Sequence, residues 1–328
     1  MDKHAEIVKS IEPFVEQNLG LLMPVDSIWQ PADILPHPDK QGWHDEIEQL
    51  RQRAKAVPDS LLVVLVGNAV TEEALPSYQT MVNRHPGVAD ETGAADSPWG
   101  RWTRGWTAEE NRHGQILSTY LYLSGRIDMR AYEVTTQYLI RNGFDPKTGN
   151  DPYLGLIYTS FQERATKISH GHTAQLCNQS GDLLLGKICA LVTGDESRHE
   201  EAYKCFVKKI SEIDPEGVVL AFAQIMKNTI TMPARLMSDG TATDLFGQFA
   251  VVAQRIGVYT MRDYAGIIDH LLDVWEIRTM SGLAGGAAQA QDFLLSLAGR
   301  YNTLADKMET RSVEQPKVPF SWIFNRPA

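Results

Sequence analysis

The motif Glu-x-x-His occurs twice in this chain, from Glu110 to His113 and from Glu196 to His199. On a helix, residues three apart share a face, so each motif directs a carboxylate and an imidazole the same way. One such motif alone is most often a surface ion pair or a satisfied core histidine. Here both motifs interrupt apolar helical stripes, whose members are Trp106, Leu117 and Tyr120 for the first motif and Cys189, Val192, Tyr203 and Phe206 for the second. The pattern therefore predicts two helices that bury charged groups in a shared core.

Two further glutamates repeat this arrangement, because Glu72 precedes the first motif and Glu163 precedes the second. One Glu from each of two helices, with Glu-x-x-His from two others, is the ligand set of di-iron and di-manganese carboxylate bundles. Buried carboxylates need a cation or a proton, and two divalent cations would balance four of them. Oxygen and imidazole donors without thiolate favour iron or manganese over structural zinc. We therefore predict a two-metal site with the ligands Glu72, Glu110, His113, Glu163, Glu196 and His199.

A proline lies close to one of these ligands. Pro76 stands four residues after Glu72, and it lacks the N–H that would bond the Glu72 carbonyl in a helix. We expect the helix to be kinked or loosened there, although a proline that merely bends a long helix fits equally well. The pair His170 and His172 is not assigned to the metal site, since the carboxylate set already satisfies the cation count.

Helical periodicity dominates the 328 residues, and no segment alternates as a strand before the C-terminus. Phe320, Trp322 and Phe324 alternate in the tail, which predicts a short strand or hairpin that packs on the helices. No low-complexity linker divides the chain, so we expect a single all-α domain over 1–328. The expected helices are 42–57, 60–84, 101–124, 128–142, 153–178, 181–211, 215–237, 245–257, 260–281 and 286–310.

Composition excludes several classes of protein. The net charge of −10 argues against a nucleic-acid binder but leaves room for a local basic patch that binds an acidic protein. The longest apolar run in the first third, Leu61 to Val66, is far shorter than the ~20 residues of a membrane-spanning helix. Three cysteines without C-x-x-C spacing suit a reducing compartment. We expect a cytoplasmic protein, unless a targeting segment has been removed.

Longer stretches resemble one family, the soluble acyl-[acyl carrier protein] desaturases, and most closely its plastid stearoyl members from plants. The similarity runs from about residue 10 to about 326. The matching runs are WQPADILP, LVVLVG, TEEALPSYQT, WTAEENRHG, YLYLSGRIDMR, YTSFQERATKISHG, DESRHE and FSWIF.

The resemblance implies a ferritin-like helical bundle with additional helices and a bridged non-haem di-iron centre of two iron ions per subunit. In that centre Glu72 and His113 would hold one iron and Glu163 and His199 the other. Glu110 and Glu196 would bridge the two.

The resemblance also implies roles for three residues around the ligands. Asp195 would accept a hydrogen bond from His113 and continue towards Trp29 as a route for electrons, and such acids fix the imidazole tautomer. Thr166, one turn after Glu163, would face the metals and could pass a proton to oxygen.

The implied reaction is O2-dependent introduction of a cis double bond, at the Δ9 position, into a saturated acyl chain carried on acyl carrier protein. Electrons would come from ferredoxin, O2 would be the co-substrate, and the enzyme would be a homodimer. No nucleic acid or membrane partner is expected.

The chain departs from the plant enzymes where the acyl tunnel is expected. Arg84 and His85 follow Met81, at positions where the plant enzymes carry small or apolar side chains. A polar pair at the closed end of the tunnel would shorten the accepted chain. Gly155 and Leu156 are further expected tunnel residues. Gly247 replaces an acidic residue near the expected carrier-protein entrance, and the absence of a transit peptide suits a bacterial cytoplasmic enzyme or a mature stromal one.

Other readings of the same ligand set remain open. A ferroxidase or storage bundle shares the ligands but would assemble into a cage. A hydroxylase or a radical-generating reductase subunit is also compatible, and Tyr120 and Tyr203 lie two turns and one turn from ligands. A non-catalytic scaffold would leave six buried ionisable groups without a purpose.

Overall fold

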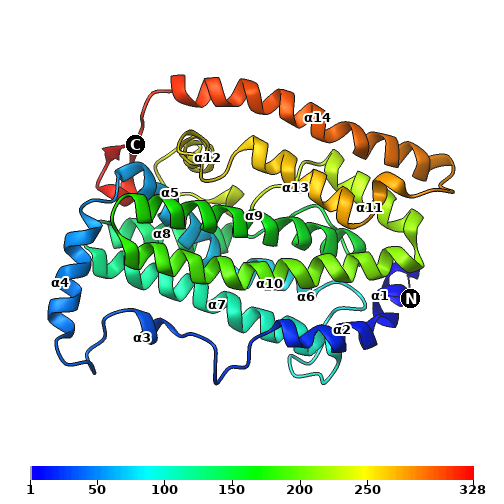
Figure 1. Cartoon of the computed structure of the whole chain (residues 1–328), viewed down its shortest axis with the longest axis horizontal. Helices are drawn as coiled ribbons and strands as arrows, with labels where there is room; N and C mark the ends of the chain where they lie inside the picture. Colours follow the sequence, from blue (N-terminus) through cyan, green and yellow to red (C-terminus); the bar gives the residue numbers. More distant parts are fainter. Residues whose placement is uncertain (1) are drawn as a thin grey trace.

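Four long helices form the centre of the structure, a computed structural model that describes residues 2–328 and, of residues 310–314, the backbone alone. They are α5 (Asp59–Glu73), α7 (Pro98–Ser124), α9 (Pro152–Gln179) and α10 (Leu183–Ile213). α5 packs on α7, α7 on α10, α10 on α9 and α9 on α5, which closes a four-helix bundle. Figure 1 shows α7, α9 and α10 running side by side along the long axis of the molecule.

Two of the bundle helices, α9 and α10, begin at an acidic side chain that satisfies one of their first N–H groups. The Asp151 side chain accepts from the Tyr153 N–H at 2.9 Å at the start of α9, and Asp182 accepts from the Leu185 N–H at 3.0 Å at the start of α10. Short acidic side chains at this position satisfy donors that have no partner within the helix. These caps set the axial positions of the two helices.

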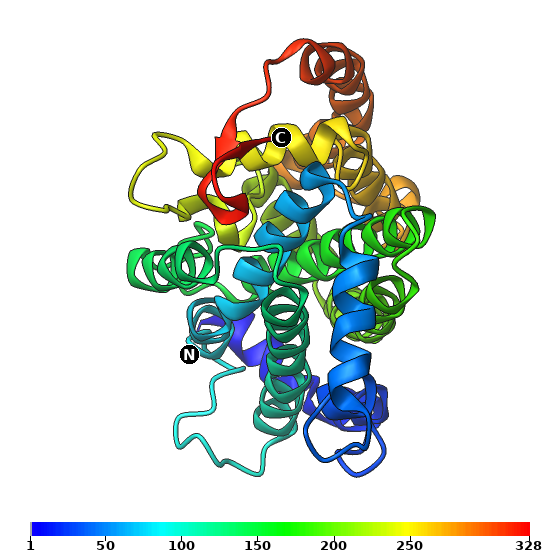
Figure 2. The same ribbon diagram turned by 90° about the vertical axis from the view of Figure 1, so that its left-hand side faces the viewer.

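Further helices cover the bundle. α14 lies over α11 and α13 on one side, α12 packs between α5 and α14, and α8 lies on α5. Figures 1 and 2 both place α14 at the outer edge, separated from the bundle by α11, α12 and α13. The remaining α-helices are α1 (Lys3–Ser10), α2 (Glu12–Asn18), α3 (Pro31–Ile34), α4 (Trp43–Ala54), α6 (Leu75–Asn83), α8 (Met129–Asn142), α11 (Pro215–Lys227), α12 (Leu245–Arg255), α13 (Met261–Val274) and α14 (Gly285–Glu314); the 3₁₀ turns are η1 (Leu19–Leu21), η2 (Pro233–Leu236), η3 (Ile277–Thr279) and η4 (Ser321–Ile323).

The predicted all-α fold with a short C-terminal hairpin is confirmed. Strand β1 (Pro319–Phe320) pairs antiparallel with β2 (Arg326–Pro327), and these are the only strands among residues 2–328. The hairpin is tied to α8, because the Trp322 indole donates to Thr135 Oγ1 at 2.9 Å and its carbonyl accepts from the Asp128 N–H at 2.8 Å. The buried Trp322 side chain thus attaches the tail to the helices.

Three predicted helix boundaries are wrong. The segment 60–84 is two helices, α5 and α6, that break at Ala74, because Pro76 supplies no N–H to continue the first. The segment 215–237 ends at Lys227, where Thr229 adopts a left-handed conformation (φ 58°) and Pro233 starts a 3₁₀ turn. The segment 260–281 ends at Val274, since Glu276 is also left-handed. The helices α1 to α3 were not predicted.

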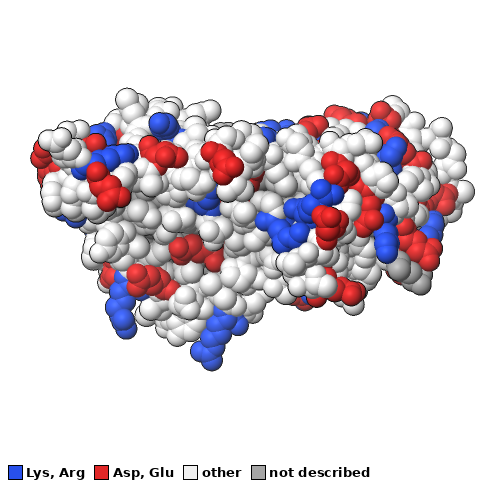
Figure 3. Space-filling model, turned by 90° about the horizontal axis from the view of Figure 1, so that it is seen from below, with Lys and Arg blue, Asp and Glu red and all other residues white. Residues whose placement is uncertain are grey.

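The surface carries both signs of charge. On the face in Figure 3, Lys and Arg side chains are interspersed with Asp and Glu, between broad uncharged areas. Among the described residues, no single helix is long and apolar enough to cross a membrane. Within that described part of the chain, one bent pair of helices, α4 and α5, which meet at 118°, passes the test on length and composition alone.

Candidate metal centre

The structure brings all six predicted ligands together inside the four-helix bundle. Each of these residues is at most 4% exposed. α5 supplies Glu72, α9 supplies Glu163, α7 supplies Glu110 and His113, and α10 supplies Glu196 and His199.

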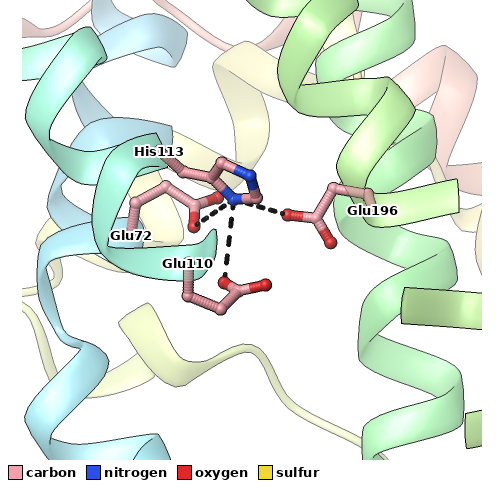
Figure 4. A group of neighbouring side chains, drawn as sticks. All are labelled: Glu72, Glu110, His113 and Glu196. Atoms are coloured by element: carbon pink, nitrogen blue, oxygen red, sulfur yellow. Dashed lines mark ion pairs between the residues drawn. The ribbon is translucent and has the colours of Figure 1, made fainter. Parts of the chain in front are cut away.

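The six residues form two overlapping groups, each compact enough to hold one ion. The first contains Glu72, Glu110, His113 and Glu196, and Figure 4 shows their side chains converging from α5, α7 and α10. The second contains Glu163 and His199 with the same Glu110 and Glu196. In each group the ligand atoms lie within 4.8 Å of one another. Two glutamates are therefore shared, which is the geometry that two bridged ions require.

Both histidines direct Nδ1 into the centre. His113 Nδ1 lies 3.3 Å from Glu196 Oε1 and 3.9 Å from Glu72 Oε2. His199 Nδ1 lies 2.8 Å from Glu110 Oε1 and 3.5 Å from Glu163 Oε2. Both Nδ1 atoms are buried and make no well-aligned hydrogen bond. The same is true of Glu110 Oε1 and Glu196 Oε1. Buried polar atoms in natural proteins are normally satisfied, so four such atoms within these two groups fit a set of metal ligands.

The other ring nitrogen of each histidine faces an acid on the opposite helix. His113 Nε2 lies 3.2 Å from Asp195 Oδ2, and His199 Nε2 lies 3.1 Å from Glu109 Oε2. An acceptor at Nε2 keeps the proton there and leaves the Nδ1 lone pair for a metal. Burial raises the pKa of Asp195, but the hydrogen bond from His113 and the charges of Arg198 and Arg112 outweigh this, so the pKa lies below its usual value.

Glu109 was not predicted as a partner, although the sequence carries a signal for it. Both motifs read acid-Glu-x-Arg-His, and the acid of each motif contacts the histidine of the other. Because the two repeats are reciprocal, Glu109 faces His199 as a hydrogen-bond acceptor, the role that the resemblance implied for Asp195 towards His113.

A line of contacts runs outward from His113. Arg112 donates to Asp195 Oδ2 at 2.9 Å and to the Trp29 carbonyl at 3.1 Å. Its guanidinium lies 4.6 Å from the centre of the Trp29 ring, which is half-buried at the surface. Trp29 is thus linked to the centre through Arg112 and Asp195.

The carboxylate ligands also have outer partners. Trp106 Nε1 donates to Glu163 Oε1 at 3.1 Å, and the Thr166 hydroxyl donates to Glu196 Oε2 at 2.6 Å. His170 Nε2 lies 2.8 Å from Glu72 Oε1. His170 belongs to neither candidate metal-binding group, but it contacts a predicted ligand, a role that its spacing in the sequence does not reveal.

Burial and mutual repulsion act on the carboxyl groups. Burial holds the pKa of Glu163 well above its ordinary value, and burial together with the charge of Glu196 raises the pKa of Glu110. Burial lowers the pKa of His113, but its hydrogen bond to Asp195 and the nearby carboxylates raise it well above the usual value overall. Bound cations would reverse these preferences by stabilising the charged carboxylates and neutral imidazoles.

Two cavities share Thr71, Glu72 and Thr166 in their walls. The smaller has a volume of about 40 Å³ and extends to Met81, Val82, Tyr158 and Pro233. The larger has a volume of about 590 Å³ and continues between α12, α13 and α14, where Gly247 is one of its wall residues. Both walls are mainly apolar.

The expected tunnel residues are all buried except Arg84. Met81 lines the smaller cavity. Leu156 is buried, and the buried His85 ring lies so close to Gly155 that an added Cβ there would be 2.6 Å from His85 Cε1. The expectation that Arg84 lines a cavity is wrong, because its side chain is exposed and donates to Thr148 Oγ1 at 3.3 Å.

Comparison with known proteins identifies relatives of this chain. The family model "Fatty acid desaturase" matches residues 3–324. The chain is 54% identical over 322 residues to an acyl-[acyl-carrier-protein] desaturase, chloroplastic, of Cucumis sativus, covering 98% of this chain and 81% of that protein. It is 54% identical over 323 residues to stearoyl-[acyl-carrier-protein] 9-desaturase 1, chloroplastic, of Arabidopsis thaliana, covering 98% and 82%.

A solved structure shares the fold at lower identity. The putative acyl-ACP desaturase DesA2 of Mycobacterium tuberculosis aligns with a TM-score of 0.52 at 18% identity, covering 83% of this chain and 95% of that one. The family match over nearly the whole length, together with relatives above 50% identity, establishes that this chain belongs to the fatty acid desaturase family.

Proposed function

We propose that this protein is an O2-dependent acyl-[acyl carrier protein] desaturase of fatty acid biosynthesis, which introduces a cis double bond at the Δ9 position. The observation that carries the proposal is the position of two apolar cavities, which share walls at Glu72 and Thr166 beside the predicted ligands. A saturated chain offers no polar group to hold, so an apolar wall that excludes water must orient it next to the oxidant. The named carrier and bond position of the plant relatives support the same substrate.

The donor set fits two iron ions per subunit. Glu72 and His113 would hold one iron, and Glu163 and His199 the other. Glu110 and Glu196 would bridge them, since they belong to both groups. Iron bound there would supply the redox chemistry, with O2 as co-substrate. The oxygen and imidazole donors, and the unpartnered ligand atoms, support this assignment.

The surrounding residues hold protons and conduct electrons in this proposal. Thr166 directs its hydroxyl proton at Glu196 Oε2 from a position that also lines both cavities, so we assign it proton transfer at the centre. Electrons would enter at the half-buried Trp29 and pass through Arg112 and Asp195 to the centre. The donor would be ferredoxin.

The acyl chain would lie across both cavities. Its carboxyl half would occupy the larger cavity and its methyl end the smaller one, so that the reacting carbons lie at Thr71, Glu72 and Thr166. We propose that His85, packed against Gly155 beyond Met81, closes the methyl end.

The partners and assembly follow the same proposal. Acyl carrier protein would deliver the chain, and its acidity would require a local basic patch on a surface whose net charge is −10. We propose a homodimer in which residues 1–328 act as one domain, located in the cytoplasm or, alternatively, in the plastid stroma.

The test is aerobic turnover of the iron-loaded protein on stearoyl- and palmitoyl-acyl carrier protein with ferredoxin, ferredoxin reductase and NADPH. Mass spectrometry should show a mono-unsaturated product, which disappears when Glu196 is replaced by Ala. A hydroxylated product would move the assignment to a hydroxylase. Iron uptake into a cage without either product would indicate storage.

A further inference from the structure

The break between α5 and α6 leaves a carbonyl without its helical partner. In a continuous helix the Glu72 carbonyl would accept from the N–H of residue 76, which is a proline. The Tyr78 hydroxyl lies 3.2 Å from this carbonyl oxygen. The Tyr78 hydroxyl thus lies within hydrogen-bond distance of the carbonyl that the sequence leaves free, directly behind a predicted metal ligand, and its single proton is shared between this carbonyl and any second acceptor.

The same hydroxyl reaches a second ligand. Tyr78 Oη lies 3.3 Å from Glu110 Oε2, and its hydroxyl is the only one on α5 or α6 that is hydrogen-bonded to a ligand carboxylate among the residues described. The ring is buried, lines the smaller cavity and packs edge-on against Trp106 at 5.9 Å between ring centres. Packing therefore holds the hydroxyl against the carboxylate.

The helix break is what allows this contact. In an unbroken helix, residues six apart point about 120° away from each other, at 3.6 residues per turn. Tyr78 would then face away from the direction of Glu72 and could not lie between Glu72 and Glu110. The break at Ala74 turns α6, so that its Tyr78 faces back to the centre.

The opposite side of the centre has an equivalent contact. Thr166 on α9 stands three residues after Glu163 and donates to Glu196 Oε2 at 2.6 Å. Each shared glutamate therefore faces one hydroxyl: Thr166 lies on α9, which supplies Glu163, and Tyr78 lies on α6, which directly follows the helix that supplies Glu72. We propose that Tyr78 is the counterpart of Thr166 and is the positioning residue that orients Glu110 for metal binding.

This inference rests on the two-metal site of the proposed function, and it assigns one hydrogen bond to each shared ligand. A hydrogen bond on Oε2 restricts rotation of the Glu110 carboxylate and leaves Oε1 directed at His199. Outer partners of metal ligands commonly contribute about 10- to 100-fold to metal affinity. Because this contact is long, we expect a contribution near the lower end.

Tyr78→Phe removes one oxygen atom and keeps the ring. The matched control is Tyr203→Phe, since Tyr203 is also buried and packs edge-on against Trp106 at 5.9 Å, but its hydroxyl makes no hydrogen bond to any of the described residues. Co²⁺ added to metal-free protein serves as the probe, read by its visible absorption. We expect Tyr78→Phe to bind one of two Co²⁺ ions about 10-fold more weakly, with an altered spectrum. Tyr203→Phe should match the wild type.

A second variant separates positioning from stability. Pro76→Ala restores the missing N–H and favours a continuous helix, which would carry Tyr78 away from Glu110. We expect it to weaken Co²⁺ binding as Tyr78→Phe does, with an unchanged or higher melting temperature. Wild-type affinity and spectrum in either variant overturn the proposal, and Pro76→Ala keeps that test available if Tyr78→Phe does not fold. If the wild-type protein binds two Co²⁺ ions but the iron-loaded protein desaturates no acyl chain, only the proposed function is overturned.

Discussion

The two halves of the candidate metal centre use the same ligand types but different backbones. In the α9 half, one helix of 28 residues carries Glu163 and, three residues later, the hydroxyl of Thr166. In the α5 half, the helix ends just after Glu72, and the corresponding hydroxyl comes from Tyr78 on the next helix. The comparison shows that a hydroxyl can be placed beside a shared glutamate either by a regular helix or by a helix break that turns the next helix towards the centre.

The halves also differ in what surrounds them. Glu163 accepts a hydrogen bond from the Trp106 indole N–H, whereas Glu72 contacts His170. Of the two cavities, Glu163 lines the smaller one and Glu72 lines both. The two unshared glutamates therefore differ in access, and on the α9 side it is Thr166 that reaches the larger cavity.

The largest expected effect follows from removing the unshared ligands one at a time. Glu72→Ala and Glu163→Ala should each bind one metal ion instead of two and lose more than about 100-fold in turnover, because loss of an outer partner alone costs about 10- to 100-fold. Added acetate should restore metal binding to Glu72→Ala only, since the larger cavity gives it access. Metal analysis with and without acetate measures this. Equal rescue of both variants would contradict the difference between the halves.

The outer partners should give a smaller, graded effect. His170→Ala leaves one oxygen of Glu72 without its 2.8 Å contact, and Trp106→Phe removes the 3.1 Å donor of Glu163. We expect metal affinity to fall by about 10-fold in each. His170→Gln keeps a donor and should recover most of the loss. Calorimetric titration of metal-free protein checks this, and a wild-type affinity for His170→Ala would remove that residue from the α5 half.

The halves meet again beyond the centre, where His85 after α6 touches Gly155 of α9. His85→Ala should lengthen the space for the methyl end and raise kcat/KM for stearoyl over palmitoyl substrate by about 10-fold, as expected for one or two methylenes. Competition between the two substrates in one reaction measures this ratio. Arg84→Ala is the control, because that side chain is exposed. An unchanged ratio in His85→Ala would show that another residue closes the tunnel.

The smallest expected effect concerns the start of α5. The hydrogen bond from Arg326 and the charge of Arg126 hold the pKa of Asp59 below its usual 3.8, which ties α5 to the C-terminal hairpin. A lowered folded pKa gives stability that is present above about pH 3.8 and is lost as the pH falls further. Asp59→Asn should cost about 1 kcal/mol at pH 7, and the difference from wild type should shrink below pH 4. Urea unfolding at both pH values measures this, and a constant difference would exclude the ionic contribution.

Much of the fold could be predicted because its signals are local. Apolar periodicity marks the long helices, and Pro76 marks the break after Glu72. The ends of the predicted helices 215–237 and 260–281 were missed, because they depend on the left-handed residues Thr229 and Glu276, neither of which is a glycine. Such conformations are imposed by surrounding packing and leave little trace in residue type.

The sequence by itself predicted the six candidate ligands, because a helix converts the spacing Glu-x-x-His into a shared direction, and carboxylates on apolar helix faces need cations or protons. Only the tertiary structure decided which acid faces which histidine, that His170 and Tyr78 contact ligands, and that Arg84 points to solvent. The contacts with ligands join residues that are 32 to 98 positions apart in the sequence. The exposure of Arg84 depends on how the turn after α6 packs. No local periodicity encodes them, since they arise from the axial register and rotation of packed helices.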